Sequence, residues 1–233
     1  MLLKKILLPV ALVAAGSMLT AEPCDGVSLF DGKSLKGWNG DPKFWSVQDG
    51  AITGITTKDN PTKGNTFIIY EDGELADFEL TMKFKIIGGN SGIQYRSFKI
   101  KGNDEWRIGG YQADFESGDK YSGICYGEKF RGILSLRGDK TTLTSENGKL
   151  KKDVENFGDT NEIGKAVKKE QWNEYKIIAK GYHFTHYING VKTTELIDND
   201  EKNRKDKGLL ALQLHAGPPM KVQFKDIKVK HLK

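Results

Sequence analysis

The sequence predicts an all-β fold in which two antiparallel sheets pack as a sandwich, and three observations support this prediction. Short apolar runs recur along the chain, and Phe78 to Ile86 alternates as a half-buried strand does. Glycine paired with aspartate or asparagine separates many of these runs, which is typical of tight turns. No stretch carries a long helical period. About a dozen strands joined in this way indicate a two-sheet sandwich.

The N-terminus resembles a secretory leader. Lys4 and Lys5 precede an apolar run from Ile6 to Ala15, and small residues follow up to Ala21. The run is too short and too weakly flanked for a membrane anchor. We therefore expect a signal peptide over residues 1–21, cleavage after Ala21, and export to the periplasm or the extracellular space. The remaining residues, 22–233, suit one large β domain without a membrane anchor.

Strands and turns are expected from the start of this domain. Asp31-Gly32 marks an early turn, and Asp49-Gly50 and Asn189-Gly190 mark two-residue hairpins. A change in the apolar phase near Lys225 and Asp226 predicts a bulge in the last strand. The polar segment 144–170 is expected to be an excursion with at most a short helix, and 198–207 a charged surface loop. The further expected strands are Asn65–Tyr70, Gly132–Arg137, Glu174–Ala179, His183–Ile188, Val191–Ile197 and Met220–Lys230.

Three strands carry an amide beside an ionisable group on the face opposite their apolar side chains. In Gly110–Glu116, Tyr111, Ala113 and Phe115 share one face, so the polar residues share the other. Ser91–Ser97 and Gly208–Gly217 repeat the pattern. If these strands are neighbours, their polar groups form the floor of a cleft that could bind sugar hydroxyl groups. The six predicted floor residues are Gln94, Arg96, Gln112, Asp114, Gln213 and His215.

Further polar residues are expected around this cleft. Glu116 ends its strand, and a glycine-rich loop over 122–132 could close one end of the cleft with Tyr126, Glu128 and Arg131. Asn90 lies in a second such loop, and Trp106 is the tryptophan nearest the polar strand in sequence. Each residue also has a simpler interpretation: Arg96 and Asp114 could form a structural ion pair, His215 a buried hydrogen bond, and Glu116 a solvated end.

Several classes of protein are not supported. Basic and acidic residues are interleaved within a formal charge of +5, which does not favour nucleic-acid binding. No zinc, phosphate-loop or serine-nucleophile motif occurs, and His183 and His186 should lie on opposite faces of a strand. No cofactor is identified, although a calcium ion bound by Asp-rich turns stays an alternative. Cys24 and Cys125 could form a disulfide or remain free thiols.

Motifs along the chain resemble one family of proteins. They are LFDGKSLKGW from Leu29, GGNSGIQYR from Gly88, GYQADFE from Gly110, YGEKFRGIL from Tyr126, YHFTHYINGV from Tyr182 and ALQLHAGPPMKVQFKDIKVK from Ala211. In this order they are similar to the secreted bacterial 3-keto-disaccharide hydrolase domain family. The resemblance implies a concanavalin A-like lectin/glucanase jelly roll. It also implies an exported enzyme that cleaves glycosides already oxidised at the third carbon.

A ketone at the third carbon would acidify the hydrogen on the second, which permits elimination of the glycosidic oxygen followed by addition of water. The hypothesis assigns His215 or Asp114 as the base, Glu116 or Glu128 as the acid, and Arg96 as the oxyanion support. Gln94, Gln112, Gln213, Tyr126, Arg131, Asn90 and Trp106 are the predicted sugar-binding residues. Two-carboxylate hydrolysis by Asp114 and Glu116 is the competing mechanism. A carbohydrate-binding module without catalysis, or a purely structural sandwich, is the alternative function.

Overall fold

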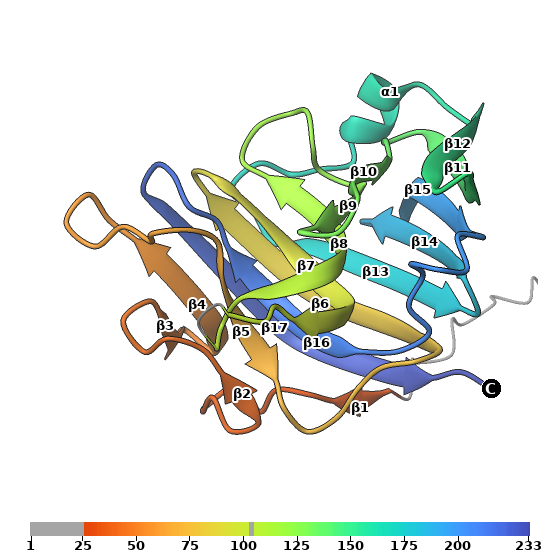
Figure 1. Cartoon of the computed structure of the whole chain (residues 1–233). Coiled ribbons are helices and arrows are strands. Elements are labelled where there is room, and N and C mark those ends of the chain that lie inside the picture. Colours follow the sequence, from red (N-terminus) through yellow and green to blue (C-terminus); the bar gives the residue numbers. More distant parts are fainter. Residues whose placement is uncertain (1–25, 103–104) are drawn as a thin grey trace, which may run out of the picture.

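Two facing sheets make up the computed structural model, which describes residues 26–102 and 105–233 (Figure 1). The larger sheet has ten strands within these residues. Its path is β12 (Lys149–Asn156), β11 (Asp139–Glu146), β15 (Val191–Asp198), β14 (His183–Ile188), β13 (Asn173–Lys180), β6 (Phe78–Ile87), β17 (Met220–His231), β4 (Ala51–Thr56) and β3 (Trp45–Gln48), with β1 (Val27–Ser28) beside β17.

The smaller sheet positions the predicted cleft. Its seven described strands follow the order β10 (Gly132–Ser135), β9 (Cys125–Glu128), β8 (Ile108–Glu116), β7 (Asn90–Lys99), β16 (Leu209–Leu214), β5 (Thr66–Tyr70) and β2 (Trp38–Asn39). The three polar strands β8, β7 and β16 are consecutive in this sheet, as the hypothesis of one cleft requires. Strand pairs are antiparallel in the described part of the chain, except for the parallel pair of β11 and β15. The predicted all-β sandwich is confirmed.

The core lies between the sheets and follows the predicted alternation. Tyr111, Ala113 and Phe115 of β8 are fully buried there, and alternate residues of β6 face them from the other sheet. The rings of Phe84 and Phe115 meet with centroids 4.0 Å apart. Burial of such rings supplies about 25 cal/mol per Å² of apolar surface, which is the main stabilisation of a sandwich of this kind.

The predicted turns and the bulge are confirmed. Asp49 and Gly50 have φ of 52° and 71° between β3 and β4, and Asn189 and Gly190 have 49° and 80° between β14 and β15. Positive φ at both positions is the type I′ geometry that matches the strand twist. The register of β17 against β6 shifts between Lys225 and Lys228, where the bulge was expected.

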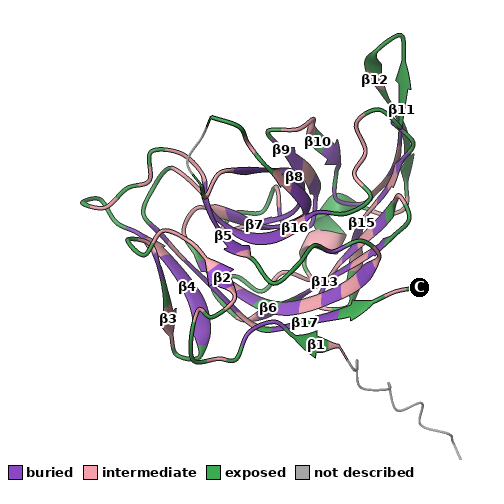
Figure 2. Cartoon of the chain, turned by 60° about the horizontal axis from the view of Figure 1, so that its bottom comes forward, coloured by how far each residue is buried: buried purple, intermediate pink, exposed green. Residues whose placement is uncertain are grey.

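Two segments differ from the sequence expectations. Segment 144–170 contains the end of β11, the whole of β12 and one short helix, α1 (Thr160–Gly164), and Figure 2 shows the β11–β12 hairpin projecting from the sandwich. The strand β12 was missed because it is almost entirely exposed and so shows no apolar alternation. The expected loop over 122–132 contains β9, so Tyr126 and Glu128 lie on a strand that pairs with β8.

The histidine and cysteine expectations have mixed outcomes. His183 is exposed and His186 is fully buried, as expected for residues three apart on a strand. Cys125 is a buried free thiol. Cys24 and the predicted leader lie outside the described residues. None of the described helices combines the length and apolar character needed to span a bilayer.

Candidate functional site

The polar face of β8 opens into a cleft of about 350 Å³, a size suited to a small ligand. Gln112, Asp114 and Glu116 line it, as the alternation of β8 predicted. Gln213 of β16 and His215, which directly follows that strand, line it as well. The remaining lining residues are Asn65, Asn90, Tyr121, Ile124, Tyr126, Glu128 and Ile133.

The amides beneath the cleft form a continuous network. Gln112 Oε1 accepts hydrogen bonds from Gln94 Nε2 at 2.8 Å and from Gln213 Nε2 at 3.1 Å. Gln112 Nε2 in turn donates to Asp114 Oδ1. Ser97 Oγ extends the network by donating to Gln94 Oε1 at 2.7 Å. Because Gln94 does not line the cleft, it acts through Gln112, which it holds in one orientation.

Asp114 is a carboxyl group held in its neutral form near neutral pH. Burial raises its pKa to about 8, because the charged form loses its hydration. The hydrogen bond from Gln112 opposes this shift, while the nearby carboxylates of Glu128 and Glu116 add to it. The side chain of Asn90 also hydrogen-bonds Asp114 and opposes the shift. A protonated carboxyl in a cleft can donate a proton to a ligand.

The two other carboxylates are held in different ways. Glu116 Oε1 accepts hydrogen bonds from the backbone N–H groups of Lys120 and Tyr121, at 2.7 and 2.9 Å, so it anchors the following turn. Glu128 is 5% exposed and lies 3.9 Å from the guanidinium of Arg107. Glu116 is therefore fixed by the turn that it anchors, whereas the side chain of Glu128 lies in the cleft wall.

His215 lines the cleft, and one of its ring nitrogens is hydrogen-bonded to the backbone. Its Nδ1 is hydrogen-bonded to the carbonyl oxygen of Ala216, which can only accept, so Nδ1 carries a proton. In the neutral ring this leaves Nε2 without a proton and able to accept one. Asn65 Oδ1 supports the segment by accepting from the N–H of Ala216 at 3.1 Å. The imidazole of His215 and the protonated carboxyl of Asp114 thus line the same cleft.

Arg96 is not in the cleft, which corrects its predicted position. The register between β7 and β8 shifts between Tyr95 and Phe98, and Arg96 has φ of 46° at this irregularity. The shift moves its side chain to another part of the molecule. There its guanidinium donates to the carbonyls of Ala76 and Gly181 and pairs with Asp77 at 2.8 Å. It does not contact Asp114, and an oxyanion-stabilising role does not fit this position.

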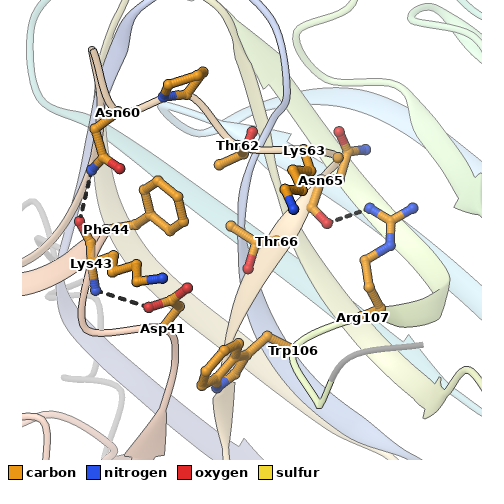
Figure 3. A pocket seen from close by; sticks show the side chains of 12 residues that line it. Asp41, Lys43, Phe44, Asn60, Thr62, Lys63, Asn65, Thr66, Trp106 and Arg107 are labelled. Carbon is orange, nitrogen blue, oxygen red and sulfur yellow. Dashed lines mark hydrogen bonds between the residues drawn. The ribbon is translucent and has the colours of Figure 1, made fainter. Parts of the chain in front are cut away.

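Arg131 and Trp106 also lie outside the cleft. Arg131 pairs with Asp198 and Asp200 and so anchors the start of the charged loop over 198–207. The prediction for Arg131 was wrong because this residue lies in the turn after β9, whereas Tyr126 and Glu128 lie on β9 and line the cleft. Trp106 lines an adjoining pocket instead (Figure 3). Asn90 lines the cleft as predicted.

Asn65 and Tyr121 line the cleft but were missed in the sequence. Asn65 directly precedes β5 and was counted as the start of an apolar strand, while β5 pairs with β16 and so brings it beside His215. The sequence signal that could have identified Asn65 is its polar side chain at the start of an otherwise apolar strand. In the described part of the chain, no group of three or more His, Cys, Asp or Glu residues is arranged to bind a metal ion. The calcium alternative is untested.

Comparisons with solved structures indicate the same fold. A protein from Parabacteroides distasonis named as a candidate glycosyl hydrolase is 20% identical with a TM-score of 0.58, covering 88% of this chain and 98% of that one. The carbohydrate-binding module CBM66 from Bacillus subtilis is 14% identical with a TM-score of 0.52, covering 83% and 95%. A Bacillus subtilis protein of unknown function with a galectin-like fold is 12% identical with a TM-score of 0.54, covering 84% of this chain and 90% of that one. At these identities the similarity concerns the fold alone.

Comparisons of sequence place the chain more specifically. A curated 3-keto-disaccharide hydrolase from Bacteroides thetaiotaomicron is 33% identical in an alignment 91 positions long that covers 34% of this chain. The match spans only 30% of that relative's length. A family model for the 3-keto-alpha-glucoside-1,2-lyase-like domain matches residues 25–230. Because this match covers almost the whole chain, the protein belongs to the carbohydrate-active family of 3-keto-alpha-glucoside-1,2-lyase-like domains.

Proposed function

We propose that the protein is an exported enzyme that cleaves glycosides oxidised to a ketone at the third carbon of the sugar. The observation that carries the proposal is that the protonated carboxyl of Asp114 lines the same cleft as His215, whose Nδ1 is hydrogen-bonded to the carbonyl of Ala216 and whose Nε2 can therefore accept a proton in the neutral ring. The family description, which names a 1,2-lyase, supports elimination as the first step. The amide network supports sugar recognition, because amides can both donate to and accept from hydroxyl groups.

The reaction begins with removal of the hydrogen on the second carbon, which the neighbouring ketone acidifies. His215 Nε2 takes this proton, and the electron pair forms a double bond between the first and second carbons. The bond from the first carbon to the glycosidic oxygen breaks, and that oxygen takes the proton of Asp114. Water then adds to the first carbon and a proton returns to the second, so the sum of the two steps is hydrolysis.

Negative charge develops on the ketone oxygen when the proton leaves the second carbon. Because Arg96 lies outside the cleft, another hydrogen-bond donor must stabilise this charge. The hydroxyl of Tyr126 and the amide of Asn65 both line the cleft and are uncharged donors. Burial raises the pKa of Tyr126, so its hydroxyl keeps its proton at neutral pH. Such donors stabilise a developing oxyanion when they are fixed in place before the reaction. The carboxyl group of Glu128 lines the same wall and, in its protonated form, is the alternative proton donor.

Release of sugar from a 3-keto-disaccharide, compared with the unoxidised disaccharide, tests the activity. We expect cleavage of the oxidised substrate only. Asp114→Asn and His215→Ala should each lower kcat/KM by about a hundredfold or more, the usual contribution of a general acid or base. His183→Ala, an exposed histidine in the other sheet, is the matched control and should keep full activity. Cleavage of both sugars at equal rates would exclude the proposal.

The reaction in heavy water separates elimination from direct two-carboxylate hydrolysis. Elimination followed by hydration places solvent deuterium on the second carbon of the product, whereas direct hydrolysis leaves the original hydrogen there. Deuterium at that carbon, detected by mass spectrometry or NMR, is the expected result. Saturable binding of sugar without cleavage of either substrate would instead identify a carbohydrate-binding module.

Export is part of the proposal and rests on the leader pattern in residues 1–21. The expected result is a mature chain that begins at Glu22 and is recovered outside the cytoplasm. Mass spectrometry of the protein from fractionated cells measures both properties. Recovery of the uncleaved chain from the cytoplasm would contradict the export proposal.

A further inference from the structure

A second pocket of about 510 Å³ adjoins the cleft. Both are lined by Asn65. A third hollow, of about 290 Å³, is lined by Asn65, Arg107 and Glu128, so it shares residues with each of the other two. The three hollows are therefore neighbours, with Asp114 lining the first and Trp106 the second. A ligand larger than one sugar could occupy the cleft and the second pocket together.

The second pocket carries mainly positive charge. Lys43, Lys63 and Arg107 line it, and Asp41 is its one acidic residue. The carboxylate of Asp41 already accepts the backbone N–H of Lys43 at 2.9 Å. Within the described residues, neither lysine forms an ion pair, and Figure 3 shows their ammonium groups directed into the pocket from different segments.

An ordinary solvated lysine explains each of these charges when it is taken alone. It does not explain why three cations from separate segments line the same pocket. Lys43 lies between β2 and β3, Lys63 precedes β5, and Arg107 precedes β8. Arg107 is also fixed, since its guanidinium donates to the carbonyl of Asn65 and lies 3.9 Å from Glu128. Three cations that line one hollow attract an anion more strongly than the same charges dispersed over a surface.

Aromatic side chains complete the pocket. Trp106 and Phe44 both line it. The indole Nε1 of Trp106 donates to Asn39 Oδ1 at 2.9 Å, which sets the orientation of the ring. A ring with a fixed orientation is suited to stacking against the apolar face of a sugar. The pocket therefore combines a surface for a sugar ring with groups that bind an acidic substituent.

We propose that this pocket binds the leaving group of the substrate, and that the preferred leaving group is an acidic sugar such as a uronic acid. The inference rests on the proposed function, which assigns the oxidised sugar to the cleft with Asp114 and His215. A disaccharide bound there extends through Asn65 and Glu128 into the second pocket. Its carboxylate meets Lys43 and Lys63, and its ring meets Trp106.

Binding of methyl β-glucuronide, compared with the uncharged methyl β-glucoside, tests the charge preference without any catalytic step. In titrations followed by NMR, we expect the glucuronide to bind about tenfold more tightly at low salt. Lys43→Ala and Lys63→Ala should each remove about threefold or more of this preference. Lys58→Ala, an exposed lysine on the same loop that does not line the pocket, is the matched control. Salt should weaken glucuronide binding more than glucoside binding.

Equal affinity for the two glycosides would overturn the proposal, and so would a preference that both lysine substitutions leave intact. Trp106→Ala should weaken both glycosides, because it removes stacking and no charge; unchanged binding would argue against a sugar in this pocket. Cleavage then gives an independent reading. If the protein cleaves the 3-keto-disaccharide but shows no charge preference, the proposed function stands and the acidic-sugar pocket is wrong. If it shows the charge preference but cleaves no 3-keto-disaccharide, the pocket binds an acidic sugar and the proposed function is wrong.

Discussion

Asp114 shows how one buried carboxyl group couples stability to chemistry. Its pKa rises to about 8 from a usual value of 3.8, chiefly because burial removes hydration from the charged form. The folded protein therefore holds this proton across a range in which the unfolded chain has released it. By linkage, the contribution of Asp114 to stability is greatest below about pH 4 and falls as the pH rises through about 8.

Asp114→Asn should therefore stabilise the protein in a pH-dependent way. The amide cannot ionise, so the substitution should raise Tm clearly at pH 9 and much less at pH 5. Thermal unfolding followed by circular dichroism at the two pH values measures this. Asp153→Asn, on the exposed strand β12, is the control and should have little effect at either pH. An equal change in Tm at both pH values would show that Asp114 is not protonated when the protein is folded.

The proton on Asp114 should also determine how kcat/KM depends on pH in the alkaline range. If Asp114 donates to the glycosidic oxygen, kcat/KM should fall tenfold for each pH unit above about 8, once the carboxyl has lost its proton. Initial rates on a 3-keto-disaccharide between pH 6 and 10 give the profile. If kcat/KM stays constant up to pH 10, Asp114 is not the proton donor and another group has this role.

At the scale of the element, a glycine on one strand makes room for a side chain on the next. Gly92 of β7 lies opposite Asp114 of β8. A Cβ at position 92 would lie 2.5 Å from Gln112 Cγ and 2.8 Å from its Nε2, so the amide side chain occupies the space that a larger residue would need. The network under the cleft thus depends on a residue that has no side chain.

Gly92→Ala should displace Gln112 and loosen Asp114, with a fall of about tenfold or more in kcat/KM and about 1–3 kcal/mol in stability. The double variant Gly92→Ala/Gln112→Ala tests the cause. If the clash is responsible, Gly92→Ala should cost little stability once Gln112 has been shortened. Chemical denaturation of the four proteins in the cycle measures the coupling. Additive costs would mean that Gly92 acts through some other contact.

Arg96 stabilises the junctions between elements. Its guanidinium bonds the carbonyls of Ala76, Gly181 and Lys205 as well as Asp77, so one side chain joins the start of β6 to two distant turns. The side chain is fully buried. A rigid fork with five donors can serve these acceptors together, whereas an ammonium group cannot.

Arg96→Lys should therefore lower stability by about 2–4 kcal/mol, because buried carbonyls lose their donors. The protein that remains folded should keep its catalytic rate per molecule, since the guanidinium lies away from the cleft. Denaturation curves and kcat at a temperature well below Tm measure the two effects. A hundredfold loss of kcat in folded protein would restore the oxyanion role for Arg96.

At the scale of the whole molecule, a buried polar cluster joins the two sheets. His186 of β14 contacts the hydroxyl of Tyr95 on β7 at 3.0 Å, and the same hydroxyl lies 3.6 Å from Cys125 Sγ on β9. Burial lowers the pKa of His186 to about 3 from 6.5. The folded protein keeps this ring neutral while the unfolded chain protonates it, so stability is lost as the pH falls below 6.5.

His186→Gln should flatten the acid side of the stability profile, because glutamine keeps an amide at this position but does not titrate. Between pH 6.5 and 4, His186 should cost the wild type up to about 1.4 kcal/mol per pH unit, and the variant should lack this slope. Urea denaturation at several pH values measures it. His183→Gln, on the exposed side of the same strand, should leave the slope unchanged. A slope that persists in His186→Gln would assign acid sensitivity elsewhere.

The sequence by itself determined the sandwich and much of the cleft floor. Alternation along a strand is a local property, so the placement of Gln112, Asp114 and Glu116 opposite Tyr111 could be predicted without knowledge of any partner strand. Turn dipeptides such as Asn189-Gly190 are local for the same reason, because positive φ is a property of the residues themselves.

Only the tertiary structure decided where Arg96 lies, how Asn65 reaches the cleft, and which state Asp114 adopts. The irregularity at Arg96 is stabilised by acceptors from three distant segments, and Asn65 meets Ala216 only because β5 pairs with β16. The raised pKa of Asp114 depends on how much water the surrounding elements exclude. Register and burial depend on contacts between residues far apart in sequence, and no local pattern encodes them.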